Sequence, residues 1–187
     1  MKTKPLIGIS SCLLGENVRY DGGHKLDHHL KNILGEYVVF LGICPELECG
    51  MSIPREPMRL EFSNNKVRLI TLSTRRDLTH QINSWIEEKL KELYSKHFCG
   101  FIFKSKSPSC ALRKFPVFGA DGSVEKTSSG LFAKALMKKY PSLPVEDESK
   151  LLEDSAKERF LKKVFDFEKK MRTEKIQCIF SSSLQKQ

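Results

Sequence analysis

The segment Leu6-Ile7-Gly8-Ile9-Ser10-Ser11-Cys12 decides the fold, because a short apolar run ends in small polar residues and a cysteine. A run of this kind is typical of a buried strand. A second run, Tyr37–Ile43, is continuously apolar, as in a parallel sheet covered on both faces, and is followed at once by Cys44. A third apolar run, Gly100–Lys104, lies shortly before Cys110. Three predicted strands therefore each lead to a cysteine.

Helical patterns separate these strands. The clearest helix is capped by Asp77 or Thr79, and it has apolar residues at helical spacing along one face: Ile82, Trp85, Ile86, Leu90 and Leu93. Further helices are predicted over Lys25–Leu34, Gly130–Tyr140 and Leu151–Met171. Strands that alternate with helices predict the α/β class. We expect a single domain with a Rossmann-like parallel or mixed sheet and helices on both faces.

The segments between these elements have weaker patterns. Val67–Leu72 is predicted to be an additional strand, and a short strand fits within Pro141–Pro144. Cys44–Pro57 is interpreted as a loop, because it holds several prolines. Residues 113–126 are interpreted as a turn-rich excursion around Asp121-Gly122.

Composition and charge limit the classes of protein to which the chain can belong. The 187 residues suffice for one domain with a substantial core. No apolar run approaches the roughly 20 residues of a membrane-spanning helix, and no export signal is recognisable, so we expect a cytoplasmic protein without membrane contacts. The formal net charge is +9. A basic surface attracts polyanions such as RNA, although a solvated lysine-rich helix face gives the same charge.

Three of the six cysteines carry the chemical prediction. In a reducing compartment they are not expected to form disulfides. Cys12, Cys44 and Cys110 follow strands, and the carboxyl ends of parallel strands meet at one edge of a sheet. Thiolates there favour zinc, copper(I) or an iron–sulfur cluster, and a structural zinc site would need four ligands. The alternative is that these cysteines are ordinary small buried side chains.

Several separated motifs resemble those of one known family. They are Ser11–Gly15, Val18–Lys25, Cys44–Glu46, Pro54–Pro57, Arg76–Thr79, Lys104–Cys110, Gly130–Ala133 and Pro141–Glu146. In this order they resemble the DUF523 family, which contains the thiouracil desulfidases. The resemblance covers roughly residues 5–165, so we interpret 1–165 as the family domain and 166–187 as a helical C-terminal tail. One departure is Ala111, where a glycine usually follows the third cysteine.

The resemblance implies roles for several residues. Cys12, Cys44 and Cys110 would bind a [4Fe-4S] cluster, and the iron without a protein ligand would take the substrate's thiocarbonyl sulfur. Water would replace the sulfur, which leaves as sulfide without a redox change of the substrate. Glu46 is the expected base, and Ser107 would pass protons or hold that base. The alternatives are a carboxylate that caps backbone amides and a hydroxyl that only shapes a turn.

Five further residues are candidates for substrate binding: Arg19, Tyr20, Asp21, Arg55 and Lys104. Arg19 would offset cluster charge or bind a phosphate, but an ion pair with Asp21 or Glu56 is an equal alternative. Arg55 and Lys104 would line the cavity unless they lie on the surface.

The remaining cysteines are not expected to bind metal. Cys49 follows no strand end of its own. Cys99 precedes an apolar strand and is expected in the core. Cys178 lies in the predicted tail.

The substrate implied by the resemblance is a thiolated pyrimidine, either free thiouracil or 4-thiouridine in tRNA. Leu143–Glu146 and the helix after it look closest to the branch that acts on tRNA. In that branch a further C-terminal domain usually follows, and its absence before Gln187 weakens the expectation of RNA binding. Two other hypotheses stay open: a non-enzymatic domain with a structural metal, and an RNA-binding accessory domain. The oligomeric state is not indicated.

Overall fold

The strands predicted to precede the cysteines form one parallel sheet, sheet A. The computed structural model describes the backbone of residues 4–184 and the side chains of residues 4–173. Sheet A has the strand order β2-β1-β5-β8, and every neighbouring pair is parallel. Its strands are β1 (Leu6–Ser10), β2 (Val39–Ile43), β5 (Phe101–Phe103) and β8 (Val145–Asp147). Their carboxyl ends therefore lie along one edge, which confirms the predicted α/β class with a parallel sheet.

A second sheet, sheet B, departs from the expectation of a single sheet. Its order is β4-β3-β6-β7, with a parallel central pair and antiparallel outer pairs. The strands are β3 (Met58–Ser63), β4 (Lys66–Thr71), β6 (Phe115–Phe118) and β7 (Val124–Ser128). The sequence predicts only β4. However, β3 reads Met-Arg-Leu-Glu-Phe-Ser, and this strict alternation is typical of a half-buried strand.

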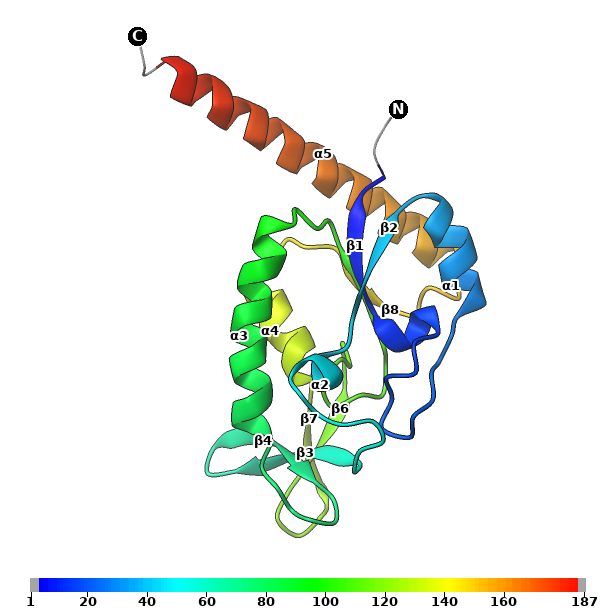
Figure 1. Ribbon diagram of the computed structural model, residues 1–187, viewed down its shortest axis with the longest axis vertical. Coiled ribbons are helices and arrows are strands. Elements are labelled where there is room, and N and C mark those ends of the chain that lie inside the picture. The colour runs from blue at the N-terminus through cyan, green and yellow to red at the C-terminus, as the bar shows by residue number, and fades with distance from the viewer. Residues whose placement is uncertain (1–3, 185–187) are drawn as a thin grey trace.

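Helices α3 (Thr79–Ser95) and α4 (Leu131–Lys139) cover one face of sheet A (Figure 1). The core on this side is aromatic. The rings of Phe101 and Phe103 stack with centroids 4.2 Å apart, and both contact Phe132 of α4. The same core includes buried residues of sheet B, so sheet B is packed firmly against the rest of the domain.

Helices α1 (His28–Ile33) and α5 (Asp154–Leu184) cover the other face, where Ile102 and Val164 are fully buried. Helices on both faces confirm that part of the predicted fold. The C-terminal part of α5 projects beyond the body of the domain (Figure 1). In the part of the chain that the structure describes, no helix combines the length and the apolar character needed to cross a membrane.

Helix boundaries differ from the prediction where side chains cap the backbone. Helix α1 begins at His28 rather than Lys25, because the Asp27 carboxylate accepts a hydrogen bond from the Leu30 N–H at 2.9 Å. It continues into the 3-10 turn η2 (Leu34–Glu36). Strand β8 lies directly after the segment in which a short strand was expected.

Candidate functional site

One cavity at the carboxyl edge of sheet A collects the cysteines that follow its strands. Its volume is about 250 Å³. Cys12 lies in a 3-10 turn, η1 (Ser11–Leu14), directly after β1, and Cys44 lies directly after β2. Cys110 lies in the turn that follows β5. All three cysteines line this cavity, so the structure brings together residues that are far apart in the sequence.

Burial raises the pKa of all three thiols. The pKa of Cys12 is raised to about 11, mainly by burial and then by the neighbouring Cys44. Burial also raises the pKa of Cys44. The pKa of Cys110 is raised well above its usual value by burial, and the nearby Glu46 carboxylate adds to this effect. The thiols are therefore protonated at neutral pH, and a bound metal would displace their protons.

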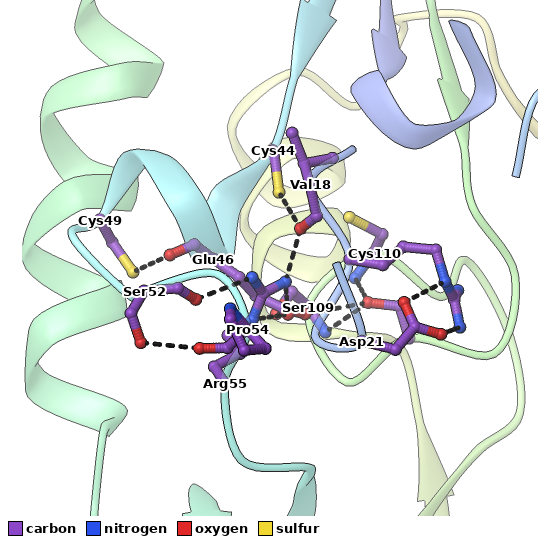
Figure 2. A network of polar contacts seen from close by, with 12 residues as sticks. Val18, Asp21, Cys44, Glu46, Cys49, Ser52, Pro54, Arg55, Ser109 and Cys110 are labelled. Carbon is purple, nitrogen blue, oxygen red and sulfur yellow. Dashed lines mark hydrogen bonds and ion pairs between the residues drawn. The ribbon is translucent and has the colours of Figure 1, made fainter. Parts of the chain in front are cut away.

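A short helix, α2 (Pro45–Glu48), begins directly after Cys44 and fixes its backbone. The Cys44 N–H donates to Glu48 Oε1 at 2.9 Å. The Cys44 thiol donates to the Val18 carbonyl oxygen, with 3.8 Å between the two atoms (Figure 2). The prediction of a loop over 44–57 is wrong here. The sequence signal for this helix was Pro45, which occupies its first position. Proline is common there because the first N–H of a helix has no partner within the helix.

Helix α4 holds the turn that carries Cys110. The Phe132 N–H donates to the Ser109 carbonyl at 3.0 Å, and the Gly130 N–H donates to the Ala111 carbonyl at 2.7 Å. A Cβ at Gly130 would lie 2.5 Å from the Ser109 carbonyl carbon and 2.7 Å from the Cys110 nitrogen. Backbone cannot approach a side chain this closely, so the helix reaches the turn only because this residue is glycine. Ala111 does not have a positive φ, and alanine fits there.

Glu46 and Arg55 form an ion pair at the cavity (Figure 2). Arg55 donates to Glu46 Oε2 from Nη2 at 2.6 Å and from Nε at 2.9 Å. The side chain of Arg55 is 7% exposed, and that of Glu46 is 12% exposed. Arg55 is itself held by the Val18 carbonyl, which accepts from Nη2 at 2.9 Å. The pair therefore fixes the direction of the Glu46 carboxylate.

Two serines contact the other carboxylate oxygen of Glu46. The Ser109 hydroxyl is fully buried and donates to Glu46 Oε1 at 2.9 Å. The Ser107 hydroxyl lies 3.4 Å from the same oxygen and also accepts the N–H groups of Ser109 and Cys110, each at 3.2 Å. Ser107 therefore both shapes the turn and faces the carboxylate. Ser109 was not predicted, because its contact with Glu46 spans 63 positions and no local pattern reveals it.

Four of the five predicted substrate-binding residues line the cavity: Arg19, Tyr20, Arg55 and Lys104. The fifth, Asp21, is not part of the cavity wall. It forms an ion pair with Arg19 at 3.3 Å, the alternative foreseen for that arginine. The Arg19 guanidinium also lies 5.4 Å from the centroid of the Tyr20 ring, so both side chains are held at the cavity mouth by each other.

Lys104 is anchored by a carboxylate to which no sequence pattern points, that of Glu148. Its ammonium pairs with Glu148, which also accepts the Ser105 N–H at 2.7 Å. The backbone N–H of Lys104 donates to the Ser10 hydroxyl at 2.9 Å. The charge of Lys104 lowers the pKa of Cys12 slightly against the larger effect of burial. Glu148 therefore positions the one lysine predicted to line the site.

The other cysteines lie outside the cavity wall. The Cys49 thiol donates to the Glu46 carbonyl oxygen at 3.3 Å (Figure 2), and Cys49 is not among the residues that line the cavity. Cys99 is buried in the core on the α1 and α5 side of sheet A, as predicted. Cys178 lies beyond the side chains that the structure describes. Among residues 4–173, no group of three or more histidine, cysteine, aspartate or glutamate side chains is placed to hold a metal ion.

The fold and the site define an α/β protein with a thiol-lined cavity at the carboxyl edge of its parallel sheet, beside a partly buried carboxylate–guanidinium pair. Residues 7–148 match the family model described as 2-thiouracil desulfurase. This match covers most of the chain. The chain belongs to the 2-thiouracil desulfurase family, which is the DUF523 family that its motifs resemble.

Two similar proteins agree with this assignment. The uncharacterized protein YbbK of Bacillus subtilis (strain 168) is 30% identical over 137 residues, which covers 70% of this chain and 89% of YbbK. A solved structure of the [4Fe-4S]-dependent thiouracil desulfidase TudS has a TM-score of 0.60 at 28% sequence identity, and the match covers 80% of this chain and 93% of that one. The similarity confirms the predicted α/β fold.

Proposed function

We propose that this chain is an enzyme that replaces the thiocarbonyl sulfur of a thiolated pyrimidine with oxygen from water and releases sulfide. The observation that carries the proposal is the meeting of Cys12, Cys44 and Cys110 in one cavity beside the Glu46–Arg55 pair. Membership of the 2-thiouracil desulfurase family supports the substrate class. The similarity to a [4Fe-4S]-dependent desulfidase supports the cofactor.

The chemistry of the donor set in the cavity suits a [4Fe-4S] cluster, which is a larger group than the single metal ion for which no set of ligands is placed among residues 4–173. Cys12, Cys44 and Cys110 would be its protein ligands, because thiolates are the donors that iron–sulfur clusters require. Among the described residues no fourth cysteine lines the cavity, so three thiolates would leave one iron without a protein ligand. Such a cluster would supply a Lewis acid that withdraws electrons from the carbon of a thiocarbonyl group.

Glu46 is the proposed general base. Its Oε2 is held by Arg55, while Oε1 accepts from Ser109 at 2.9 Å and from Ser107 at 3.4 Å, so water would reach Oε1 in place of the longer Ser107 contact. In the proposed reaction Glu46 takes a proton from water as the water oxygen bonds to the thiocarbonyl carbon. The carbon–sulfur bond then breaks and a carbonyl forms. One water is consumed, sulfide is released, and no electrons leave or enter the substrate.

The remaining site residues are assigned by their place at the cavity. Ser107 is proposed to pass the proton between Glu46 and the reacting groups, since its hydroxyl is 3.4 Å from Oε1. Tyr20 and Lys104 are proposed to contact the pyrimidine ring and its polar atoms. Arg19 is proposed to do the same, with Asp21 acting through it by the ion pair.

Two substrates remain in competition within this proposal. Free thiouracil is favoured by the family match, and 4-thiouridine in tRNA is favoured by the net charge of +9. A cytoplasmic location and the division into a domain over 1–165 and a tail over 166–187 stay predictions.

Anaerobic reconstitution with iron and sulfide, followed by a desulfuration assay, tests the proposal. The reconstituted protein is incubated with 2-thiouracil and, separately, with tRNA that contains 4-thiouridine. The expected result is release of sulfide and formation of the oxygenated base from at least one of them. A fully loaded protein that desulfurates neither would contradict the proposal. Bound zinc without inorganic sulfide would favour the non-enzymatic domain with a structural metal.

A further inference from the structure

A second concave surface, which we call the basic groove, lies between sheet B and helices α3 and α4. Its volume is about 970 Å³, and it shares no lining residue with the thiol-lined cavity. Its ionised lining residues are Lys66, Arg68, Lys126, Lys134, Asp77 and Glu87. Four cationic side chains therefore face two carboxylates.

The basic groove has a net positive charge, because its four cationic side chains exceed the carboxylates of Asp77 and Glu87 by two. Arg68 is paired with Asp77 at 3.0 Å. Within the described part of the chain, Lys66, Lys126 and Lys134 form no ion pair with a carboxylate, and all three are exposed. The Lys126 ammonium instead lies 2.9 Å from the centroid of the Phe62 ring. Three lysines are thus available to an anionic ligand.

The shape and the other lining residues of the groove suit a chain of phosphates. Small-molecule pockets are enclosed and mainly apolar. The basic groove is instead open and has polar and apolar surface in similar amounts, with amide and hydroxyl groups from Asn65, Asn83 and Ser84 beside the lysines. Such side chains are the usual hydrogen-bonding partners of phosphate and sugar oxygens in nucleic acids.

Strand β3 links the groove to the thiol-lined cavity. Met58 at its start lines the cavity, and Phe62 near its end lines the basic groove. The two residues are four positions apart and face the same side of the strand, which places them about 13 Å from each other. A free base is too small to reach both sites, whereas a polynucleotide with one base in the cavity would extend over this distance.

We infer that the basic groove binds the phosphate backbone of an RNA strand whose thiolated base enters the cavity. The identity of that base rests on the proposed function, but binding at the groove is measurable without it. The concave shape argues against a membrane surface, which is flat on this scale. An acidic protein would satisfy the charge alone, so it is an outcome that the test distinguishes.

The test compares two variants that each lose three positive charges. The groove variant is Lys66→Gln/Lys126→Gln/Lys134→Gln, and the control is Lys162→Gln/Lys163→Gln/Lys169→Gln on the exposed surface of α5. Fluorescence anisotropy measures the affinity of the full chain for an unmodified tRNA transcript at several salt concentrations. The groove variant is expected to bind about tenfold more weakly or worse, and its log–log salt slope to fall by about 2 to 3. The control is expected to bind nearly as the wild type.

Further measurements distinguish RNA binding at the basic groove from the proposed enzymatic function and from binding of other partners. Equal loss of affinity in both variants would overturn the inference, because it would mean that only overall charge matters. Competition by polyglutamate as strong as that by RNA would also overturn it and would indicate an acidic protein partner. Both variants are expected to desulfurate free 2-thiouracil alike. If no form desulfurates any substrate while the groove variant alone loses tRNA binding, the proposed function fails and this inference stands.

Discussion

Replacing Gly130 with alanine tests how helix α4 holds the turn that carries Cys110. The new Cβ would lie 2.5 Å from the Ser109 carbonyl carbon and 2.7 Å from the Cys110 nitrogen, whereas ordinary contacts begin near 3.4 Å. Both neighbours are backbone atoms and cannot rotate away. The helix or the turn must therefore move by roughly 1 Å, which disturbs the hydrogen bond from the Phe132 N–H to the Ser109 carbonyl.

The expected cost follows from this overlap. Inserting a methyl group into a closely packed site costs about 1–3 kcal/mol. In a protein of this size each kcal/mol lowers Tm by about 2–4 °C, so Gly130→Ala is expected to lower Tm by roughly 2–12 °C. Gly35→Ala is the matched control, because its nearest contact would be Phe40 at 3.5 Å and its φ is not positive. It is expected to leave Tm unchanged.

Two measurements on each variant check this reasoning. Thermal unfolding of the metal-free protein gives Tm, and iron content after anaerobic reconstitution reports on the position of Cys110. Gly130→Ala is expected to fall in both, while Gly35→Ala matches the wild type in both. If Gly130→Ala unfolds at the wild-type temperature and binds the full amount of iron, the close approach of α4 to the turn is refuted.

Substitutions at three other residues address the base, its support and the pH dependence of stability. Glu46→Gln is expected to lower turnover of the preferred thiolated pyrimidine by about 10²- to 10⁴-fold with unchanged iron content, and unchanged turnover would remove Glu46 as the base. Ser109→Ala is expected to lower kcat with little change in KM and to shift the pH dependence of kcat, whereas Ser109→Thr is expected to keep part of the wild-type rate. If Ser109→Ala lowers Tm but leaves kcat unchanged, the role of Ser109 is purely structural. Glu61→Gln is expected to cost about 1–2 kcal/mol at neutral pH, because hydrogen bonds from Arg75 and then Arg59 lower the pKa of Glu61. This stabilisation is fully present above the ordinary pKa of glutamate and is lost as the pH falls through the lowered pKa of Glu61 in the folded protein. The free energies of unfolding of the wild type and of Glu61→Gln, measured with urea, are therefore expected to become equal at acid pH.

The meeting of the three cysteines was predictable because it depends on a rule about whole strands. Each strand that precedes Cys12, Cys44 or Cys110 is a short apolar run, and the ends of parallel strands share one edge of the sheet. Neither side-chain contacts nor turn geometry had to be known. The presence of helices on both faces follows from the same alternation of patterns.

The contacts that hold the site together were not predictable in this way. Ser109 reaches Glu46, and Glu148 reaches Lys104, across long stretches of sequence. The requirement for Gly130 arises only from the backbone of a turn some twenty positions earlier. Strands β3, β6 and β7 of sheet B were missed for a different reason, because β3 and β7 contain no continuous apolar run and β6 contains Pro116, which argues against a strand. In β3 the alternation of apolar and polar residues was nevertheless a usable signal.

The iron and inorganic sulfide content of single Cys→Ser variants after anaerobic reconstitution tests the three-thiol site most directly. The Cys49→Ser variant is expected to hold as much iron and as much sulfide as the wild type, since Cys49 does not line the cavity. Replacement of Cys12, Cys44 or Cys110 is expected to remove most of both elements. Clusters of wild-type content in all three of those variants would contradict the claim that these thiols share one metal centre.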